Sequence, residues 1–276
     1  TIMVSIIISF YERLDHLKCC LDSLSLCAKA FDEVVVADDG SSPETIEAFR
    51  NHIKRYDFPI THAWHPNEGF RLAASRNNGI RHACGDYLIF LDCDFLVLPS
   101  TIVEHLRAAR PGKAVGGGFK YLDAPVTAKI LNGAITRDLL ERLDGQLPDR
   151  EIIKRHRRTI KRTILMRLRL KSPKSQSLGS HYSIYRKDLE RVNGYDENFV
   201  GWGGEDEDLG IRLVRAGVYC RSAIRSARVL HLWHPPAITD RRWQEGPNIQ
   251  YFNRKEIPVF CINGLQKPEH ARQDSP

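Results

Sequence analysis

The sequence has few of the features that mark membrane, secreted and common nucleotide-binding proteins. No apolar run approaches the roughly 18 residues of a transmembrane helix. The opening Thr1–Ser5 has neither a basic start nor an apolar signal core. G-x-G-x-x-G and G-x-x-x-x-G-K-[ST] are both absent, so dinucleotide and P-loop sites have no support. The chain begins without an initiator Met, which leaves open whether an upstream anchor has been removed.

Cysteine is present without a pattern. The seven cysteines are an odd number and show no C-x-x-C spacing. This argues against a disulfide framework and favours reduced thiols, as in a cytoplasmic protein. A peripheral position at the inner face of the membrane is left open. The 276 residues suit one large domain or two small ones.

Positive charge is confined to one stretch. Residues 151–174 hold ten Lys and Arg against one acid, so this stretch contributes +9 to the net charge. The net charge of the whole chain is +7, so the remaining residues sum to −2 and are slightly acidic. A nucleic-acid protein more often carries such charge across its folded face, so no nucleic-acid partner is expected. The stretch has helical spacing at Ile153, Ile160, Ile164 and Leu168, which predicts a basic amphipathic helix or a mobile segment. A solvated helix, an acceptor lid and a contact with an anionic membrane surface all stay open.

Apolar runs and helical periodicities alternate along the first 120 residues. The runs predict buried strands that are separated by helices, for example a helix at 14–24. Ser41 and Glu44 have the spacing of a capping box, so a second helix is expected from about Thr45. Alternating strands and helices predict a parallel sheet. The expected strands are Val4–Phe10, Phe31–Ala37, Ile60–Trp64, Tyr87–Leu91 and Ala114–Phe119.

Two carboxylates end the fourth of these strands, at Asp92 and Asp94. Residues i and i+2 of an extended segment point to the same side, so both can face one site. Two like charges held together are costly unless a cation lies between them. A divalent cation carrying a phosphate would serve, because hard cations prefer oxygen ligands. The plain alternative is a strand that ends in an acidic loop.

A second pair of acids, Asp38 and Asp39, ends the second strand. Carboxylates at such an edge can bind a nucleoside base or ribose, although a helix cap is an alternative role. Arg71 and Arg76 flank the start of a predicted helix, where guanidinium groups suit phosphate oxygens. Two surface arginines are the alternative for that pair.

The segment from Trp202 to Asp208 combines an aromatic ring, two glycines and four acids. The acids open a helix, where negative charge is favourable. The aromatic–glycine pair predicts a close-approach loop beside a flat apolar surface on which a sugar can stack. One of the acids could be a general base, whereas Asp208 is expected to face Arg212. Further on, His231 and His234 are potential metal ligands, although a structural histidine is the commoner case.

The order of these motifs is more specific than any one of them. It runs SFYERLDHL, VVVADDGS, NEGFRLAASRNNGI, DYLIFLDCD, GYDENFVGWGGEDEDLGIRL and HLWHP. The chain resembles a family 2 glycosyltransferase of the GT-A fold over roughly 3–120 and 178–235. Its C-terminal part is similar to the galactosyltransferase and N-acetylgalactosaminyltransferase type. The resemblance implies one α/β domain, in which a mostly parallel, Rossmann-like sheet is flanked by helices and a basic helical segment is inserted.

The resemblance also implies roles for individual residues. Asp92, Asp94 and His231 would bind Mn²⁺ (or Mg²⁺), with His234 as a weaker candidate. Asp206 would be the base. Trp202, Gly203, Gly204 and Glu205 would line the sugar and acceptor site. The donor nucleotide would contact Ser9, Tyr11, Arg13, Asp38, Asp39, Arg71, Arg76, Asp92 and Cys93. Arg76 matches the family's ARN pattern, although this chain reads Ser-Arg-Asn.

These roles predict a metal-dependent, inverting transfer of a Gal-, GalNAc- or Glc-type sugar from a UDP-sugar to a glycan or glycolipid hydroxyl. Two alternatives are a non-catalytic sugar- or polyanion-binding module on a degenerate transferase fold and a nucleotidyltransferase. The expected regions are a nucleotide-sugar-binding half at 1–122, the basic insertion at 123–177, an acceptor and catalytic half at 178–240 and a weakly ordered C-terminal tail at 241–276.

Overall fold

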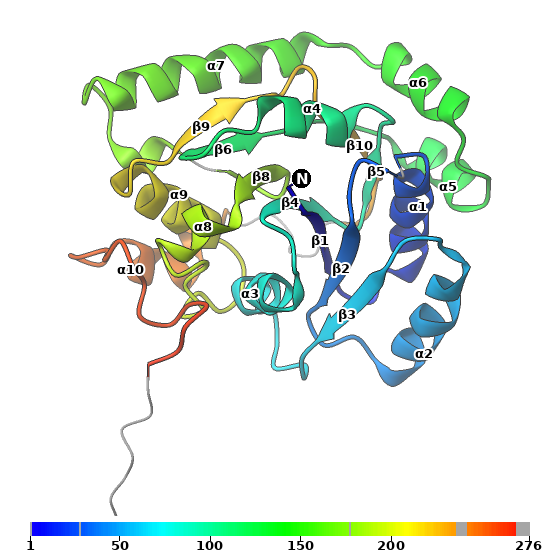
Figure 1. Cartoon of the computed structure of the whole chain (residues 1–276), viewed down its shortest axis with the longest axis horizontal. Coiled ribbons are helices and arrows are strands. Elements are labelled where there is room, and N and C mark those ends of the chain that lie inside the picture. The colour runs from blue at the N-terminus through cyan, green and yellow to red at the C-terminus, as the bar shows by residue number, and fades with distance from the viewer. Residues whose placement is uncertain (1, 28, 177, 236–241, 269–276) are drawn as a thin grey trace, which may run out of the picture.

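The computed structural model describes residues 2–27, 29–176, 178–235 and 242–268. A seven-stranded sheet forms its centre, with helices on both faces (Figure 1). The strands of this sheet lie in the order β3 (Ile60–Trp64), β2 (Glu33–Asp38), β1 (Val4–Phe10), β4 (Tyr87–Asp92), β8 (Tyr182–Tyr185), β6 (Lys113–Gly116) and β9 (Tyr219–Ser222). The α-helices are α1 (Leu14–Ser25), α2 (Pro43–His52), α3 (Leu72–His82), α4 (Thr101–Ala108), α5 (Ala124–Leu131), α6 (Arg137–Gln146), α7 (Arg150–Arg167), α8 (Arg186–Glu190), α9 (Glu205–Arg215) and α10 (Asn248–Phe252).

The first four long strands are parallel, which confirms the predicted topology. β1 and β2 are buried along their whole length because helices cover both of their faces. Apolar side chains of α1 pack on one face, and those of α3 and α9 pack on the other. The β-branched runs of the sequence are therefore the inner layer of a three-layer α/β domain. Short 3₁₀ turns lie at Ile53–Arg55, Pro173–Ser175 and Trp243–Glu245.

The expected strand at Ala114–Phe119 is two strands in two different sheets. β6 ends at Gly116, and β7 (Gly118–Tyr121) joins a three-stranded sheet with β10 (Arg228–His231) and β5 (Phe95–Val97). A Cβ atom at Gly117 would lie 2.3 Å from the ring of His181, so only glycine lets the chain cross at this point. β5 and β10 pair antiparallel, which places His231 opposite Phe95, next to Asp94.

The expected capping box at Ser41 and Glu44 is also corrected. The cap of α2 is Ser42, whose hydroxyl accepts a hydrogen bond from the backbone N–H of Thr45. Ser41 instead accepts from the backbone N–H of Glu12 at 2.9 Å. The loop after β1 therefore uses the hydroxyl that the sequence pattern assigns to the helix.

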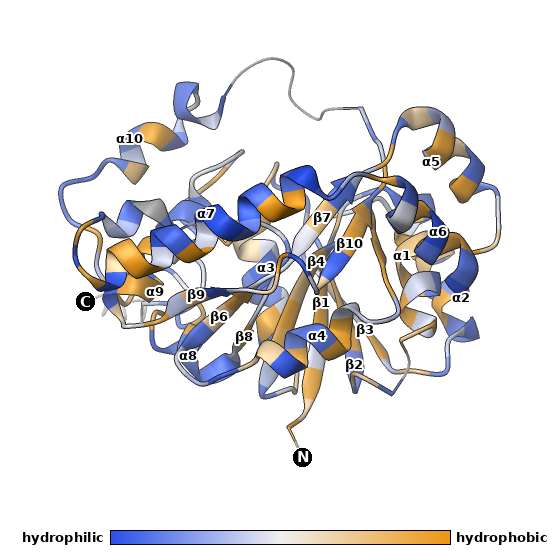
Figure 2. Cartoon of the chain, turned by 90° about the horizontal axis from the view of Figure 1, so that it is seen from above, coloured by the Kyte–Doolittle hydropathy of each residue, from blue (hydrophilic) through white to orange (hydrophobic). Residues whose placement is uncertain are grey.

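The basic segment forms a regular helix, α7, which contacts β9 and β7 across the edge of the sheet (Figures 1 and 2). Apolar and charged turns alternate along it in Figure 2. The residues at helical spacing face outward, since Ile160 is 42 % exposed, Ile164 51 % and Leu168 62 %. Ile152 and Met166 are the side chains that α7 buries. No helix of the described part of the chain is long and apolar enough to cross a membrane.

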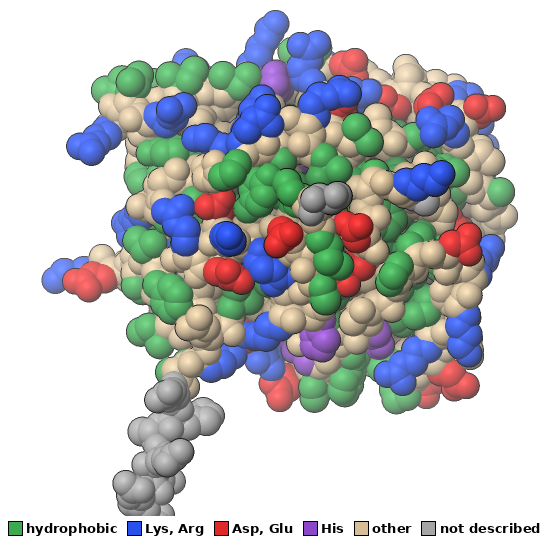
Figure 3. All heavy atoms as spheres, in the orientation of Figure 1, with side chains coloured by type: hydrophobic (Ala, Val, Ile, Leu, Met, Phe, Trp, Pro, Cys, Tyr) green, Lys and Arg blue, Asp and Glu red, His purple; other side chains and the backbone are tan. Residues whose placement is uncertain are grey.

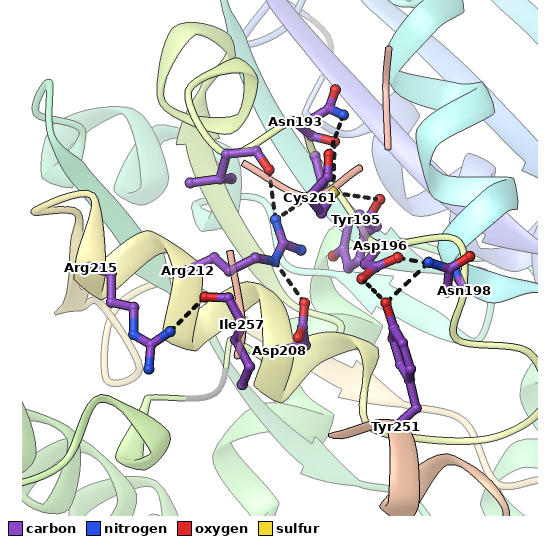
Figure 4. A network of polar contacts seen from close by, with 12 residues as sticks. Asn193, Tyr195, Asp196, Asn198, Asp208, Arg212, Arg215, Tyr251, Ile257 and Cys261 are labelled. Carbon is purple, nitrogen blue, oxygen red and sulfur yellow. Dashed lines mark hydrogen bonds and ion pairs between the residues drawn. The ribbon is translucent and has the colours of Figure 1, made fainter. Parts of the chain in front are cut away.

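The described part of the C-terminal segment, 242–268, packs on the domain, in contrast to the weakly ordered tail expected there. Phe252 and Ile257 pack against Phe199 and Ile211. The fully buried Arg212 donates to Asp208 at 2.7 Å in the network of Figure 4. Sequence reasoning missed this packing because four widely spaced apolar residues have no local periodicity.

Candidate functional site

The site lies at the edge where β1, β2 and β4 end. The strand register places Ser9 beside Asp92 and Phe10 beside Asp38. In Figure 2 the N-terminus lies at the lower edge and the strands run away from it toward the side that holds α5 and α10. Ligands of open α/β sheets bind at this carboxyl edge.

The two acids at the end of β2 are fully engaged by neighbours. Asp38 Oδ2 lies 2.8 Å from His62 Nε2, and Asp39 Oδ1 lies 2.7 Å from His65 Nε2. Asp39 Oδ2 accepts from the backbone N–H of Arg71 at 2.8 Å. Sequence reasoning missed both histidines, although their position on and just after β3 beside β2 was available as a signal.

The other residues assigned to the nucleotide differ in exposure. Tyr11 is 48 % exposed, and its hydroxyl accepts from the Asn67 amide at 3.1 Å. The Arg71 guanidinium pairs with the exposed Glu68. The Cys93 side chain is buried in the core beside α1, so only its backbone faces the strand ends.

Arg76 ties three parts of the site together. Its side chain is 1 % exposed, and Nη1 donates to Asp206 Oδ1 at 2.8 Å. Its Nη2 lies 3.6 Å from Asp92 Oδ1, and Nε donates to Ser9 at 3.3 Å. Partial burial raises the pKa of the Asp92 carboxyl to about 7, against the opposing charge of Arg76. Arg76, which was expected to bind phosphate, thus lies between Asp206 and Asp92.

Asp94 lies with both candidate histidines. One ligand atom each from Asp94, His231 and His234 fall within 4.8 Å of one another. Asp94 Oδ2 is 3.1 Å from His234 Nε2, and Oδ1 is 3.7 Å from His231 Nε2. Arg13 reaches the same carboxylate at 3.3 Å. Asp92, the other expected ligand, is not part of this group among the described residues.

The hydrogen bonds of the two histidines prepare them to bind a metal. The Nδ1 atoms of His231 and His234 each lie 2.8 Å from a backbone carbonyl oxygen, so Nδ1 carries the proton and Nε2 keeps its lone pair. Nε2 of His234 and the Asp94 carboxylate are then two acceptors in contact, which requires a proton or a cation between them. Asp94 Oδ1 is buried and has no hydrogen-bond partner among the described residues. A carboxylate with two imidazoles fits Mn²⁺ or a similar divalent ion.

The aromatic–glycine segment forms the start of α9. Gly203 and Gly204 have φ of 90° and 95°, which a side chain would strain, and Trp202 is 40 % exposed beside them. Glu205 is buried, and its Oε2 has no partner within the described chain. Burial, together with the charge of Asp206, raises the pKa of Glu205 to about 8.

The expected pair of Asp208 with Arg212 is confirmed, and both side chains are fully buried. Asp208 therefore supports α9 from inside the domain. Of the four acids in the row, Asp206 is the one that faces Arg76 and the end of β4.

Comparisons with known proteins identify a sugar-transferring enzyme of the GT-A fold. The model of "Glycosyl transferase family 2" matches residues 5–192, and that of the "N-terminal domain of galactosyltransferase" matches residues 161–235. The first match covers more than half of the chain. The chain therefore belongs to glycosyl transferase family 2.

Individual relatives agree with this assignment. The chain is 30 % identical to a chondroitin synthase of Escherichia coli over 271 residues, which are 93 % of this chain and 39 % of that protein. The chain thus spans less than half the length of this relative.

Two solved structures share the fold at low identity. A mannosyltransferase from Pyrobaculum calidifontis, in complex with GDP-Man and Mn²⁺, gives a TM-score of 0.58 at 18 % identity over 86 % of this chain and 58 % of its own. GalNAc-T7 with UDP, GalNAc and Mn²⁺ gives 0.56 at 17 % identity over 84 % of this chain and 44 % of its own.

Proposed function

We propose that this glycosyltransferase uses a divalent metal and a UDP-sugar to transfer a hexose or N-acetylhexosamine, with inversion, to a hydroxyl of a glycan or glycolipid. The observation that carries the proposal is Arg76, which holds Asp206 on one side and faces Asp92 on the other. An acid that is fixed in this way beside the carboxylate at the end of β4 is positioned as the base for an acceptor hydroxyl.

The donor nucleotide would lie along the ends of β1 and β2. Asp39, which His65 orients, would lie near the ribose, whereas the fully buried Asp38, paired with His62, would support this edge from inside the domain. Tyr11 is exposed and can cover the base. Ser9 and Arg13 border the same edge.

Asp94, His231 and His234 would hold the metal, with Asp92 facing the bound diphosphate. A divalent ion held there would supply positive charge to offset the charge that develops on the leaving UDP. The two known structures with bound Mn²⁺ support a metal in this fold.

The protein's own residues would position and deprotonate the acceptor. Asp206 takes the proton of the acceptor hydroxyl as its oxygen attacks the anomeric carbon and UDP leaves from the opposite side. Glu205, protonated near neutral pH, can donate a hydrogen bond to a sugar hydroxyl. Trp202 offers a partly exposed aromatic face for stacking of a sugar ring.

The test is UDP release from a panel of UDP-sugars with Mn²⁺, with Mg²⁺ and with a chelator. We expect turnover of at least one donor with metal, and loss of turnover on chelation that added Mn²⁺ restores. GDP-mannose is the matched control for the nucleotide, since one structural neighbour binds it. Turnover that is unaffected by chelation would rule out the metal. Nucleotide transfer without release of UDP would favour a nucleotidyltransferase, and binding without turnover of any donor would favour a non-catalytic module.

The outward face of α7 supports a second proposal, a contact with an anionic membrane surface. Ile160, Ile164 and Leu168 are exposed there. In Figure 3 hydrophobic side chains are interleaved with Lys and Arg along the upper edge, where Figure 1 places α7. Apolar residues flanked by basic ones are typical of helices that lie in a membrane interface. The double substitution Ile160→Ser/Ile164→Ser should reduce the amount of protein that sediments with phosphatidylserine vesicles. Equal sedimentation of wild type and variant would contradict the membrane contact.

A further inference from the structure

We propose that the acceptor carries an acidic group, and that this group binds in a pocket between α7, the end of β6, β9 and the segment that leads into β8. The inference rests on the proposed function, because it names the class of acceptor for the same reaction. It comes from the side of α7 that lines this pocket, where Arg155, Arg158 and Arg162 lie along the helix between the buried Ile152 and Met166.

The pocket has a volume of about 260 Å³. This lies near the lower limit of the roughly 300–1,000 Å³ that small-molecule sites occupy, so it suits part of a larger ligand. The helix contributes Arg155, Arg158 and Arg162, and the opposite wall includes Gly117 and Ser180. Gly117 is partly exposed on this wall, and the space beside its Cα is filled by the His181 ring.

The three arginines are not paired with an acidic side chain among the described residues. Within the described ranges, none of the three guanidinium groups forms a hydrogen bond or ion pair with a side chain or carbonyl. Arg155 lies over the ring of Phe119 at 4.0 Å. Burial lowers the pKa of Arg155, and the like charge of Arg158 adds to this effect. Three unneutralised cations around one pocket attract an anion, and each can offer a fork of donors to a carboxylate or phosphate.

The pocket adjoins the reaction centre. Ser180, on its wall, lies close enough to the Asp92 carboxyl to lower the pKa of that group. Phe119, also on its wall, lies 6.3 Å from the His231 ring between centroids. A ligand held by the arginines is therefore next to the acids that act on the sugar.

The strand order separates this pocket from the nucleoside. Asp38 and Asp39 lie at the end of β2, whereas the pocket lies at β6 and β9, on the other side of β4. An anion there is on the acceptor side of Asp92. The anion in the pocket would be the carboxylate of a hexuronic acid or a phosphate monoester carried by the acceptor.

The helix supplies its own matched control. Arg158 and Arg162 line the pocket, whereas Arg157 and Lys161 do not, and all four side chains are exposed. The double variants Arg158→Gln/Arg162→Gln and Arg157→Gln/Lys161→Gln remove the same charge from the same helix without disturbing its buried face. A difference between them reports the pocket and not the net charge.

The experiment measures binding by calorimetry in the presence of UDP and Mn²⁺. The probes are an oligosaccharide that ends in a hexuronic acid, its methyl ester, and a neutral-ended partner with and without a 6-phosphate. We expect the acidic form to bind wild type on the order of tenfold to a hundredfold more tightly than its neutral partner. The pocket variant should lose this preference and the control variant should keep it. A preference for the hexuronic acid over the 6-phosphate, or the reverse, identifies which acidic group the pocket binds.

Three results would overturn the inference. The first is equal affinity of wild type for acidic and neutral probes. The second is an equal loss of the preference for acidic probes in both double variants. The third is a pocket variant that binds UDP more weakly but keeps its preference for acidic probes. A loss of phosphatidylserine vesicle binding confined to the pocket variant, without acid preference, would assign the arginines to a membrane instead. Because binding is measured without transfer, failure of the proposed enzymatic function appears separately, as absence of UDP release from every donor.

Discussion

The two ends of the site differ in how completely their acids are paired. At the nucleoside end, Asp38 and Asp39 each have both oxygens in contact with a neighbouring donor. At the reaction end, Asp94 Oδ1 and Glu205 Oε2 are buried without a partner among the described residues. Unpaired buried acceptors reduce stability, and are kept where a ligand completes them. In the proposed function, the nucleoside end would thus be formed in advance, whereas metal and substrate would complete the reaction end.

The largest expected effect separates the two ends by activity. Asp206→Asn keeps the shape of the side chain but cannot accept the proton, so kcat should fall by roughly 10²–10⁴-fold. The UDP dissociation constant should stay within about twofold, because no nucleoside contact changes. Steady-state kinetics and calorimetry on one preparation measure both quantities. Transfer at the wild-type rate would remove Asp206 as the base.

The next effect concerns the stability of the reaction end. Arg76→Ala leaves Asp206 and Asp92 without their buried cation, so the free energy of unfolding should fall by about 3–5 kcal/mol. Arg71→Ala, at the start of the same helix, removes a guanidinium paired with the exposed Glu68 and should cost about 0.5 kcal/mol or less. Urea unfolding of the two variants makes the comparison. Equal destabilisation of the two variants would show that the ion pairs of Arg76 with Asp206 and Asp92 do not stabilise the fold.

The reciprocal change at the nucleoside end is smaller. Asp39→Asn should weaken UDP binding about tenfold, because one charged hydrogen-bond acceptor is lost. The preference among UDP-sugars should be retained, since the sugar lies at the other end. A variant that changes sugar preference but not UDP affinity would contradict the division of the site.

The smallest effect is a pH dependence of stability. The folded pKa of Glu205 lies near 8, above its unfolded value, so the folded state binds the extra proton and stability falls as pH rises between about 4.5 and 8. Glu205→Gln should remove this contribution and gain about 1 kcal/mol or more at pH 8 relative to pH 5. Thermal unfolding at the two pH values measures the gain. Parallel pH profiles of wild type and variant would show that Glu205 is not protonated in the fold.

Local patterns predicted the elements of this protein well. β1 and β3 have the expected bounds because β-branched runs report burial directly. The acids after β2 and β4 were found for the same reason, since a buried run ends abruptly at each of them. What a residue contacts across the fold was not predictable in this way.

Three examples show the limit. The histidines that orient Asp38 and Asp39 lie more than twenty positions along the chain from them. The turn at Gly117 depends on a ring at His181. The apolar spacing in α7 identified a helix correctly, but Ile160 and Ile164 face outward, whereas Arg155, Arg158 and Arg162 line the pocket beside the domain. Each outcome depends on long-range contacts, which a single segment does not record.

The packing of the C-terminal segment has a consequence for the order of folding during synthesis. Asn193, which follows α8, donates its amide to the Cys261 carbonyl and accepts from the backbone N–H of Gln266 (Figure 4). Arg254 pairs with the buried Asp208 of α9. α9 carries Asp206, so the helix of the proposed base lacks its contact with Arg254 until that residue has left the ribosome. A nascent chain halted before residue 250 should therefore bind UDP before it can transfer a sugar.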